Sequence, residues 1–136
     1  MKAGAVGVSV VQLGSPRAPE EGVRIGTVRR PPRGVPKAEF SNRDYYDVWL
    51  PNLAPSAELM SLGRAATTDA EWKLFERGYR KEMALPEASH VIDLLAAMSH
   101  TSAFAVGCYC DDEHRCHRGI LRQLLRDRDA VFAEDV

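Results

Sequence analysis

One stretch of the sequence is almost uninterrupted in its apolar character: Ser102–Tyr109, which reads SAFAVGCY. A run of this kind, without alternation of polar and apolar residues, is typical of a strand buried on both faces, as in the parallel sheets of α/β proteins. Parallel strands also require crossover segments between them, and these segments cover the sheet. The run therefore favours a fold built around a mostly parallel sheet.

Strands and helices alternate along the chain. Val6–Leu13 and Val23–Val28 read as two further strands. Helices are indicated by a capping-box pattern at Thr68 and by apolar residues at helical spacing. These residues are Trp72, Phe75, Tyr79 and Met83, then Val91, Leu94, Leu95 and Met98, and finally Ile120, Leu121, Leu124 and Leu125. We expect an α/β protein, a single domain over residues 1–136, with a small, mostly parallel sheet and helices on both faces.

Two segments are ambiguous. Asp44–Trp49 (DYYDVW) suggests a helical turn, and the tail Asp129–Val136 suggests either a short strand or a frayed end.

Composition is that of a folded domain. Of the 136 residues, 45% are hydrophobic, and the net charge is −1, which argues against disorder and against bulk attraction to nucleic acid or anionic membranes. No apolar run approaches the roughly 20 residues that span a bilayer. The chain has three cysteines, too few and too close together for the disulfide framework of a secreted protein. We therefore expect reduced thiols and a cytoplasmic protein.

The polar loop Cys108–Arg118, CYCDDEHRCHR, follows the apolar run and leads into the last predicted helix. Loops at the carboxyl ends of the strands form the ligand-binding edge of open α/β sheets. A helix that begins near Cys116 or His117 points its unpaired N–H groups and the positive end of its dipole toward this edge. Arg115, Arg118 and a protonatable His117 add positive charge. The loop therefore predicts a site for a phosphate, carboxylate or nucleotide.

Cysteine chemistry is a second interpretation of the loop. Cys116, at a helix N-terminus beside arginines, is expected to have an enlarged thiolate fraction, and Cys110 is the next candidate. The catalytic residues would be Cys116, His117 and, as general acid or base, Glu113. Neither Cys108 nor Cys110 meets the phosphatase pattern of a cysteine and an arginine separated by five residues.

Zinc binding is a third interpretation. Its ligands would be Cys108, Cys110, Cys116 and either His114 or His117, because thiolate and imidazole are the ligands that zinc prefers. The spacing matches no standard zinc finger. We predict no other cofactor.

A second basic segment, Arg29–Lys37 (RRPPRGVPK), must be a rigid loop, because its prolines fix φ and remove backbone donors. It follows a predicted strand, so it is expected at the same edge of the sheet. Arg29 and Arg33 would then converge with Arg118 and Arg115 on a small anionic ligand. The alternative is a non-catalytic regulatory or nucleic-acid-binding module that uses the basic Pro-Arg-Gly turn.

The aromatic residues have two expected uses. Tyr45, Tyr46 and Trp49 are candidates for stacking on a base or sugar, although core packing is the commoner use of such residues. The aromatic residues of Trp72–Tyr79 lie at helical spacing and are expected in the core.

Four motifs in a fixed order resemble the bacterial and archaeal family catalogued as domain of unknown function 488. They are PRGVPK (Pro32–Lys37), LAPS (Leu53–Ser56), W-x2-F-x3-Y (Trp72–Tyr79) and the Cys-His-Arg ending of Cys108–Arg118. The similar region runs from Arg24 to about Leu125.

The resemblance implies a small α/β domain of unsettled activity. It also implies a shared pocket, which here would use Arg29, Arg33, Cys116, His117 and Arg118. Many members have an aspartate just before the first of these arginines, where this chain has Thr27 and Val28. Members often have tryptophan before Pro-Arg-Gly, where this chain has Pro31. The leading hypothesis is an anion- or nucleotide-binding pocket with enzymatic chemistry at its Cys-His-Arg end.

Overall fold

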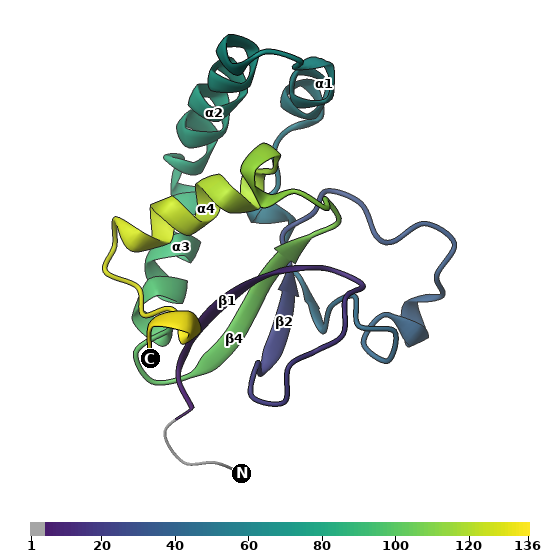
Figure 1. The fold of residues 1–136 in the computed structure, drawn as a ribbon, viewed down its shortest axis with the longest axis vertical. Coiled ribbons are helices and arrows are strands. Elements are labelled where there is room, and N and C mark those ends of the chain that lie inside the picture. The colour runs from purple at the N-terminus through teal and green to yellow at the C-terminus, as the bar shows by residue number, and fades with distance from the viewer. Residues whose placement is uncertain (1–4) are drawn as a thin grey trace.

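The computed structural model describes residues 5–136, and its centre is a four-stranded sheet in which all neighbouring strands are parallel. The strands lie in the order β1-β4-β2-β3 (Figure 1). They comprise Gly7–Gln12 (β1), Val23–Gly26 (β2), Val48–Trp49 (β3) and Ala103–Cys108 (β4). The apolar run forms β4, which lies between β1 and β2. The predicted α/β class and parallel sheet are confirmed.

Three α-helices join β3 to β4, and a fourth follows β4. They comprise Ala57–Ala65 (α1), Asp69–Met83 (α2), Pro86–Met98 (α3) and His117–Arg126 (α4). The capping box at Thr68 forms with Glu71 and starts α2, and Pro86 occupies the first turn of α3. Short 3-10 helices comprise Lys37–Glu39 (η1), Pro51–Leu53 (η2), Glu113–Arg115 (η3) and Ala133–Asp135 (η4). Among the described helices, none has the length and apolar character to cross a membrane.

The two faces of the sheet have different covers. On one face, Val8, Ile25 and Phe104 pack with buried residues from all four α-helices and form the main core. On the other face, a smaller cluster that includes Leu13 and Tyr46 lies under the loops that follow β1 and β2. Both faces of the sheet are therefore buried, and the second cover consists mainly of loops.

A buried ion pair holds this loop layer to the sheet. Arg24 on β2 is fully buried, and its Nη2 lies 2.9 Å from the carboxylate of Glu21. Its Nη1 donates to the carbonyl oxygens of Ser15 and Asp44, which belong to the two covering loops. One guanidinium therefore joins both loops to β2.

The ambiguous segments are now resolved. Asp44–Trp49 is not a helical turn but ends in the edge strand β3, where Trp49 Nε1 donates to the carbonyl oxygen of Val28 at 2.6 Å. A positive φ of 64° at Asp44 turns the chain into this extended path. In the tail, Phe132 forms a bridge with Val8, and η4 follows.

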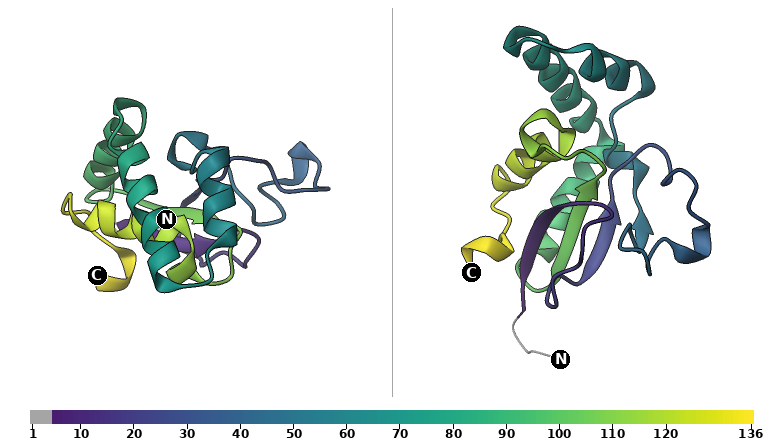
Figure 2. Two further views of the ribbon diagram at one scale, coloured as in Figure 1. Left: turned by 90° about the horizontal axis from the view of Figure 1, so that it is seen from above. Right: turned by 45° about the vertical axis from the view of Figure 1, so that its right-hand side comes forward.

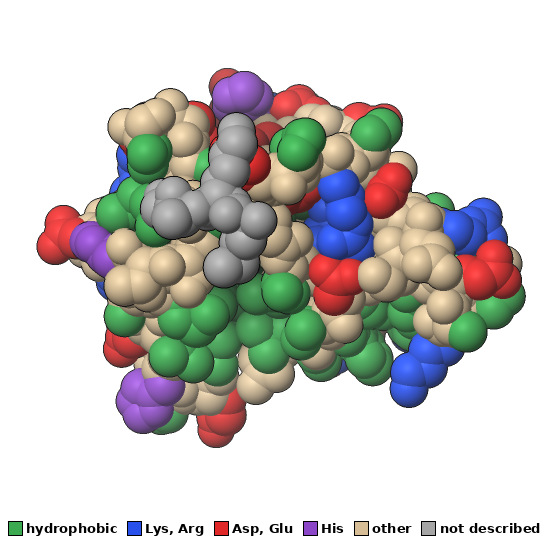
Figure 3. Space-filling view, turned by 90° about the horizontal axis from the view of Figure 1, so that it is seen from below, with side chains coloured by type: hydrophobic (Ala, Val, Ile, Leu, Met, Phe, Trp, Pro, Cys, Tyr) green, Lys and Arg blue, Asp and Glu red, His purple; other side chains and the backbone are tan. Residues whose placement is uncertain are grey.

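The carboxyl ends of β1, β2 and β4 meet at one end of the sheet, and the pair α1–α2 extends beyond that end (Figures 1 and 2). The opposite end is seen from below in Figure 3. There, acidic and basic side chains are interspersed among apolar ones, so the described residues on that face form no continuous basic surface. The end of the sheet under α1 and α2 is therefore where a charged site can form.

Candidate functional site

A cavity of about 610 Å³ lies between the carboxyl end of the sheet and the helices α1 and α2. Its lining comes from the segments that follow β2 and β4, from α1 and α2, and from the start of α4. Its volume is within the range of small-molecule sites, roughly 300–1,000 Å³. The predicted edge of the sheet therefore does carry a hollow of suitable size.

Four arginines line this cavity: Arg29, Arg30, Arg64 and Arg115. Arg29 Nε donates to the carbonyl oxygen of Pro55 at 2.8 Å, and Arg115 forms an ion pair with Asp69 at 2.7 Å. No aspartate or glutamate is among the described residues that line the cavity. The cavity is therefore cationic.

Aromatic side chains form part of the same wall. Trp72 is half-buried, lines the cavity and stacks on Phe75 with ring centroids 4.5 Å apart. The guanidinium of Arg115 lies 5.7 Å from the centre of the Trp72 ring. Tyr109 also lines the cavity, and its hydroxyl donates to the carbonyl oxygen of Arg30. A ligand in the cavity can thus contact both cations and aromatic faces.

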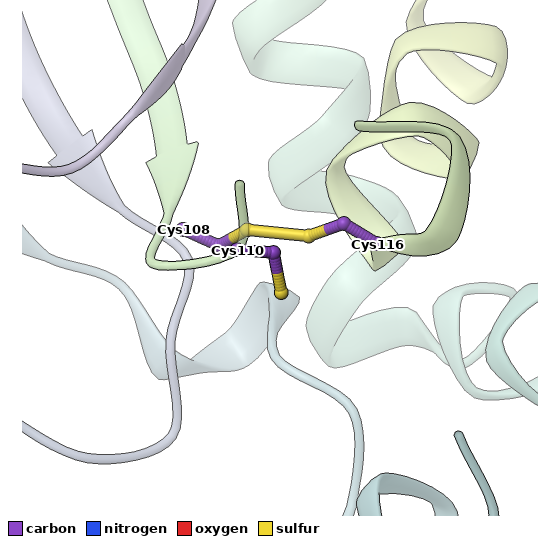
Figure 4. Close-up of side chains that lie close together, drawn as sticks. All are labelled: Cys108, Cys110 and Cys116. Carbon is purple, nitrogen blue, oxygen red and sulfur yellow. A yellow bond between two sulfur atoms is a disulfide. The ribbon is translucent and has the colours of Figure 1, made fainter. Parts of the chain in front are cut away.

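The three cysteines line this cavity. Figure 4 shows their side chains close together, with a disulfide between Cys108 and Cys116. Cys108 ends β4, Cys110 lies in the loop, and Cys116 is the N-cap of α4. Their sulfur atoms all lie within 4.8 Å of one another. Cys108 and Cys116 are joined by a disulfide, and Cys110 is a free thiol. The expectation of reduced thiols is therefore wrong for Cys108 and Cys116 in this structure. Burial raises the pKa of the Cys110 thiol, although the charge of Arg118 acts in the opposite direction. We call these residues the cysteine cluster.

Arg118 lies behind the cysteine cluster and does not line the cavity. It is only 5% exposed, and its Nη1 lies 3.7 Å from Cys108 Sγ. The guanidinium donates to backbone carbonyl oxygens, the shortest bond being 2.7 Å to Cys110, while its Nε has no partner. No carboxylate pairs with it among the described residues. It is therefore a buried cation beside sulfur that has no direct ion pair, although the charge of the Glu113 carboxylate acts on it.

His117 is also buried. Its Nε2 lies 2.7 Å from the carbonyl oxygen of Thr27, so Nε2 carries the proton, and Nδ1 lies 3.9 Å from Cys116 Sγ with its lone pair free. Burial lowers the pKa of His117 to about 4, although the bond to Thr27 opposes this shift. A neutral histidine of this kind accepts a hydrogen bond from a thiol. It is a poor acceptor of the thiol's proton, because its pKa is roughly four units below that of an ordinary cysteine.

Three predicted residues lie away from the cavity. Arg33 is exposed in the proline-rich loop and does not line it. His114 has a side chain that is 96% exposed, and it pairs with Asp112 rather than with the cysteines. Glu113 is bound by Arg122 at 2.6 Å, and this hydrogen bond holds the pKa of Glu113 below its usual value. Arg33 therefore does not join the cavity arginines, and the carboxylate of Glu113 is bound to Arg122 although the Glu113 backbone accepts from the Cys116 N–H.

The arginine at the phosphatase spacing from Cys116 is Arg122, a match that the sequence analysis did not consider. Its guanidinium is held by Glu113 and Glu134 and does not line the cavity. The spacing is thus met in sequence without the geometry that a phosphatase loop needs. Sequence reasoning also missed Arg30, whose signal was its place in the basic loop, and Arg64, which no motif marks.

Comparison with known proteins gives one family. No curated protein and no solved structure was found to match this chain. A family model, DUF488-N3a, described as the active DUF488-N3 subclade, matches residues 8–129. That range contains every strand and α-helix of the domain except the first residue of β1. It also includes the four motifs and the cavity-lining residues. The chain belongs to the domain of unknown function 488 family, in its DUF488-N3a subclade.

Proposed function

We propose that the cavity binds a small anionic ligand, a phosphate-bearing or nucleotide-like molecule, and that the protein acts on it at the cysteine cluster. The observation that carries this proposal is the charge of the lining: four arginines and no carboxylate among the described lining residues. Among the described residues, Arg115 is the one arginine of the four with a carboxylate partner, Asp69, whose side chain is 90% exposed. A cavity that concentrates positive charge in this way attracts anions from solution.

The shape of the lining supports a ligand with an aromatic part as well as an anionic one. Trp72 offers a half-buried ring, and Met60 and Pro55 add apolar surface. Bases stack on such rings irrespective of sequence, because every base has a π-face. Arginine forks bind phosphate oxygens in pairs. A nucleotide-like ligand would use both properties of the cavity.

The free thiol within reach of such a ligand is Cys110, and reduction of the disulfide would add the thiols of Cys108 and Cys116. His117 supports them by accepting a hydrogen bond at Nδ1, and Arg118 supports them with its charge. The description of the matched subclade as active is consistent with an enzyme. Glu113 takes no part in the proposal, because Arg122 holds it as a carboxylate outside the cavity lining.

Titration calorimetry with inorganic phosphate and with adenosine monophosphate tests this proposal. The variant Arg64→Ala removes a cavity arginine, and it should weaken binding of both ligands about 10- to 100-fold, the usual value of a hydrogen bond to a charged group. The matched control is Arg77→Ala, which removes an exposed arginine of α2 that does not line the cavity. The proposal fails if neither ligand binds. It also fails if Arg64→Ala binds phosphate as tightly as the unchanged protein and the control Arg77→Ala do.

A further inference from the structure

We propose that the cysteine cluster binds one Zn²⁺ ion through the Sγ atoms of Cys108, Cys110 and Cys116, with a fourth coordination position that opens into the cavity. The three sulfur atoms come from a strand end, a loop and a helix N-cap, yet they lie within 4.8 Å of one another. Thiolate is a preferred ligand of zinc, and a tetrahedral ion requires its ligands to converge in this manner.

The structure joins Cys108 and Cys116 by a disulfide, so the proposed ion binds the reduced form of the pair (Figure 4). The backbone spacing of the two cysteines favours that reduced, ion-bridged form. Their Cα atoms are 7.9 Å apart. Disulfides in proteins hold Cα atoms about 4.4–6.8 Å apart, and a wider pair needs backbone movement before it can be bridged. Two thiolates on opposite sides of a metal ion do not need this movement.

Charge balance gives a second, independent argument. A dithiol reductant first converts the Cys108–Cys116 disulfide into two thiols and is itself oxidised to a disulfide. The three thiols then bind the ion by releasing three protons to solvent, so three thiolates and one Zn²⁺ carry a net charge of −1. Buried Arg118 carries +1, touches Cys108 Sγ and has no carboxylate partner among the described residues. The assembled site is therefore neutral. Without the ion, and with neutral thiols, Arg118 is a buried charge with only carbonyl oxygens and neutral sulfur in direct contact, because Arg122 holds the Glu113 carboxylate that acts on it. A buried charge without a direct counter-charge is costly.

The fourth position follows from the place of the cluster. All three cysteines line the cavity, so the ion has protein on one side and the arginine-lined hollow on the other. Catalytic zinc sites have three protein ligands and keep the fourth position for water or substrate. His114, a ligand in the original zinc interpretation, cannot fill it, because its side chain is exposed and paired with Asp112. The assignment of the fourth coordination position rests on the proposed anionic ligand, because an oxygen of that ligand would displace the water from the ion.

The metal content of the whole protein, purified under reducing conditions, tests the site. Elemental analysis should find about one zinc per chain. Replacement of zinc by Co²⁺ should give the near-ultraviolet charge-transfer absorption of cobalt–thiolate bonds. The variant Cys110→Ser should weaken Zn²⁺ binding by more than the roughly 10–100-fold seen when a residue that only orients a ligand is changed. Ser61→Ala is the control, since Ser61 is exposed and also lines the cavity.

Two results would overturn the site. One is a Cys108–Cys116 disulfide that persists in the protein purified under reducing conditions, which a thiol reagent would reveal as a single free thiol per unfolded chain once the reductant has been removed. The other is Zn²⁺ binding that Cys110→Ser leaves unchanged. The fourth coordination position is tested separately, because phosphate that binds there should shift the visible absorption bands of the cobalt-substituted protein. If calorimetry shows that phosphate binds but these bands do not shift, the cavity binds anions and the metal has no coordination position open to them.

Discussion

The guanidinium of Arg118 is in contact with the sulfur of Cys108, at 3.7 Å, and both side chains are almost fully buried. The same guanidinium donates to the carbonyl oxygens of Cys110 and Asp111. One cation therefore fixes the path of the loop that carries the cysteines and also places positive charge against their sulfur atoms. The Cys-His-Arg motif thus contributes a buried support to the cavity as well as one of its sulfurs.

Arg118→Lys should destabilise the domain by about 1–3 kcal/mol, because an ammonium lacks the planar fork that reaches several carbonyl oxygens at once. Urea unfolding measures the change, and Arg77→Lys on the surface of α2 is the control. An unfolding free energy that Arg118→Lys does not alter would mean that the fork contributes nothing to the loop.

The stability of the domain should depend on pH through His117. Its pKa is lowered from 6.5 to about 4 in the folded state. Between these values the unfolded chain binds more protons than the folded one, so stability rises with pH across this window and is flat above it. The loss from pH 7 to pH 4 should be on the order of 3 kcal/mol. Asp47, whose pKa is lowered to about 2, adds its own loss only below about pH 4.

Urea unfolding at several pH values between 4 and 7.5 measures this slope. His117→Gln should flatten the curve in that window, whereas His90→Gln, at an exposed histidine, should leave it unchanged. Equal slopes for all three proteins would contradict the assignment to His117.

Trp72→Leu should weaken the binding of a nucleotide more than the binding of inorganic phosphate. Loss of the ring removes stacking, so binding of adenosine monophosphate should weaken by about 1–3 kcal/mol while binding of inorganic phosphate changes little. Calorimetry compares the two ligands, with Leu74→Ala, an exposed change on the same helix, as control. If both ligands weaken equally, Trp72 supports the cavity without stacking on the ligand.

A substitution at Arg33 tests whether ligands bind in the cavity or at the Pro-Arg-Gly turn. Arg33 is exposed outside the cavity, so Arg33→Ala should leave phosphate binding unchanged. If the protein instead works as a nucleic-acid-binding module, Arg33→Ala should weaken binding of an oligonucleotide in a salt-dependent way. A gel-shift series at several salt concentrations, with Arg64→Ala alongside, tells these outcomes apart.

Much of the fold could be predicted from local chemistry. The apolar run predicted the buried strand β4, and Thr68 predicted the start of α2, because each signal depends only on neighbouring residues. The site depends more on tertiary placement. Trp72 and Phe75 share a helical face and both line the cavity, yet Phe75 is buried in the core while Trp72 is only half-buried. The start of α2, which carries Trp72, lies beyond the end of the sheet.

The Cys-His-Arg motif shows a second limit of sequence reasoning. His117 and Arg118 were predicted to face an anion as charged groups at a helix start. The first turn of α4 instead lies against the sheet, so both side chains are 5% exposed and His117 is neutral. Charged residue types indicate a polar site, but burial decides which of them touch the ligand.

A crystal structure of the protein with phosphate tests the central claim most directly. The account predicts a phosphate ion inside the cavity, within hydrogen-bonding distance of Arg29 or Arg64 and next to the cysteine cluster. An ion bound only at Arg33 on the outer loop, or a cavity without phosphate at saturating concentration, would contradict it.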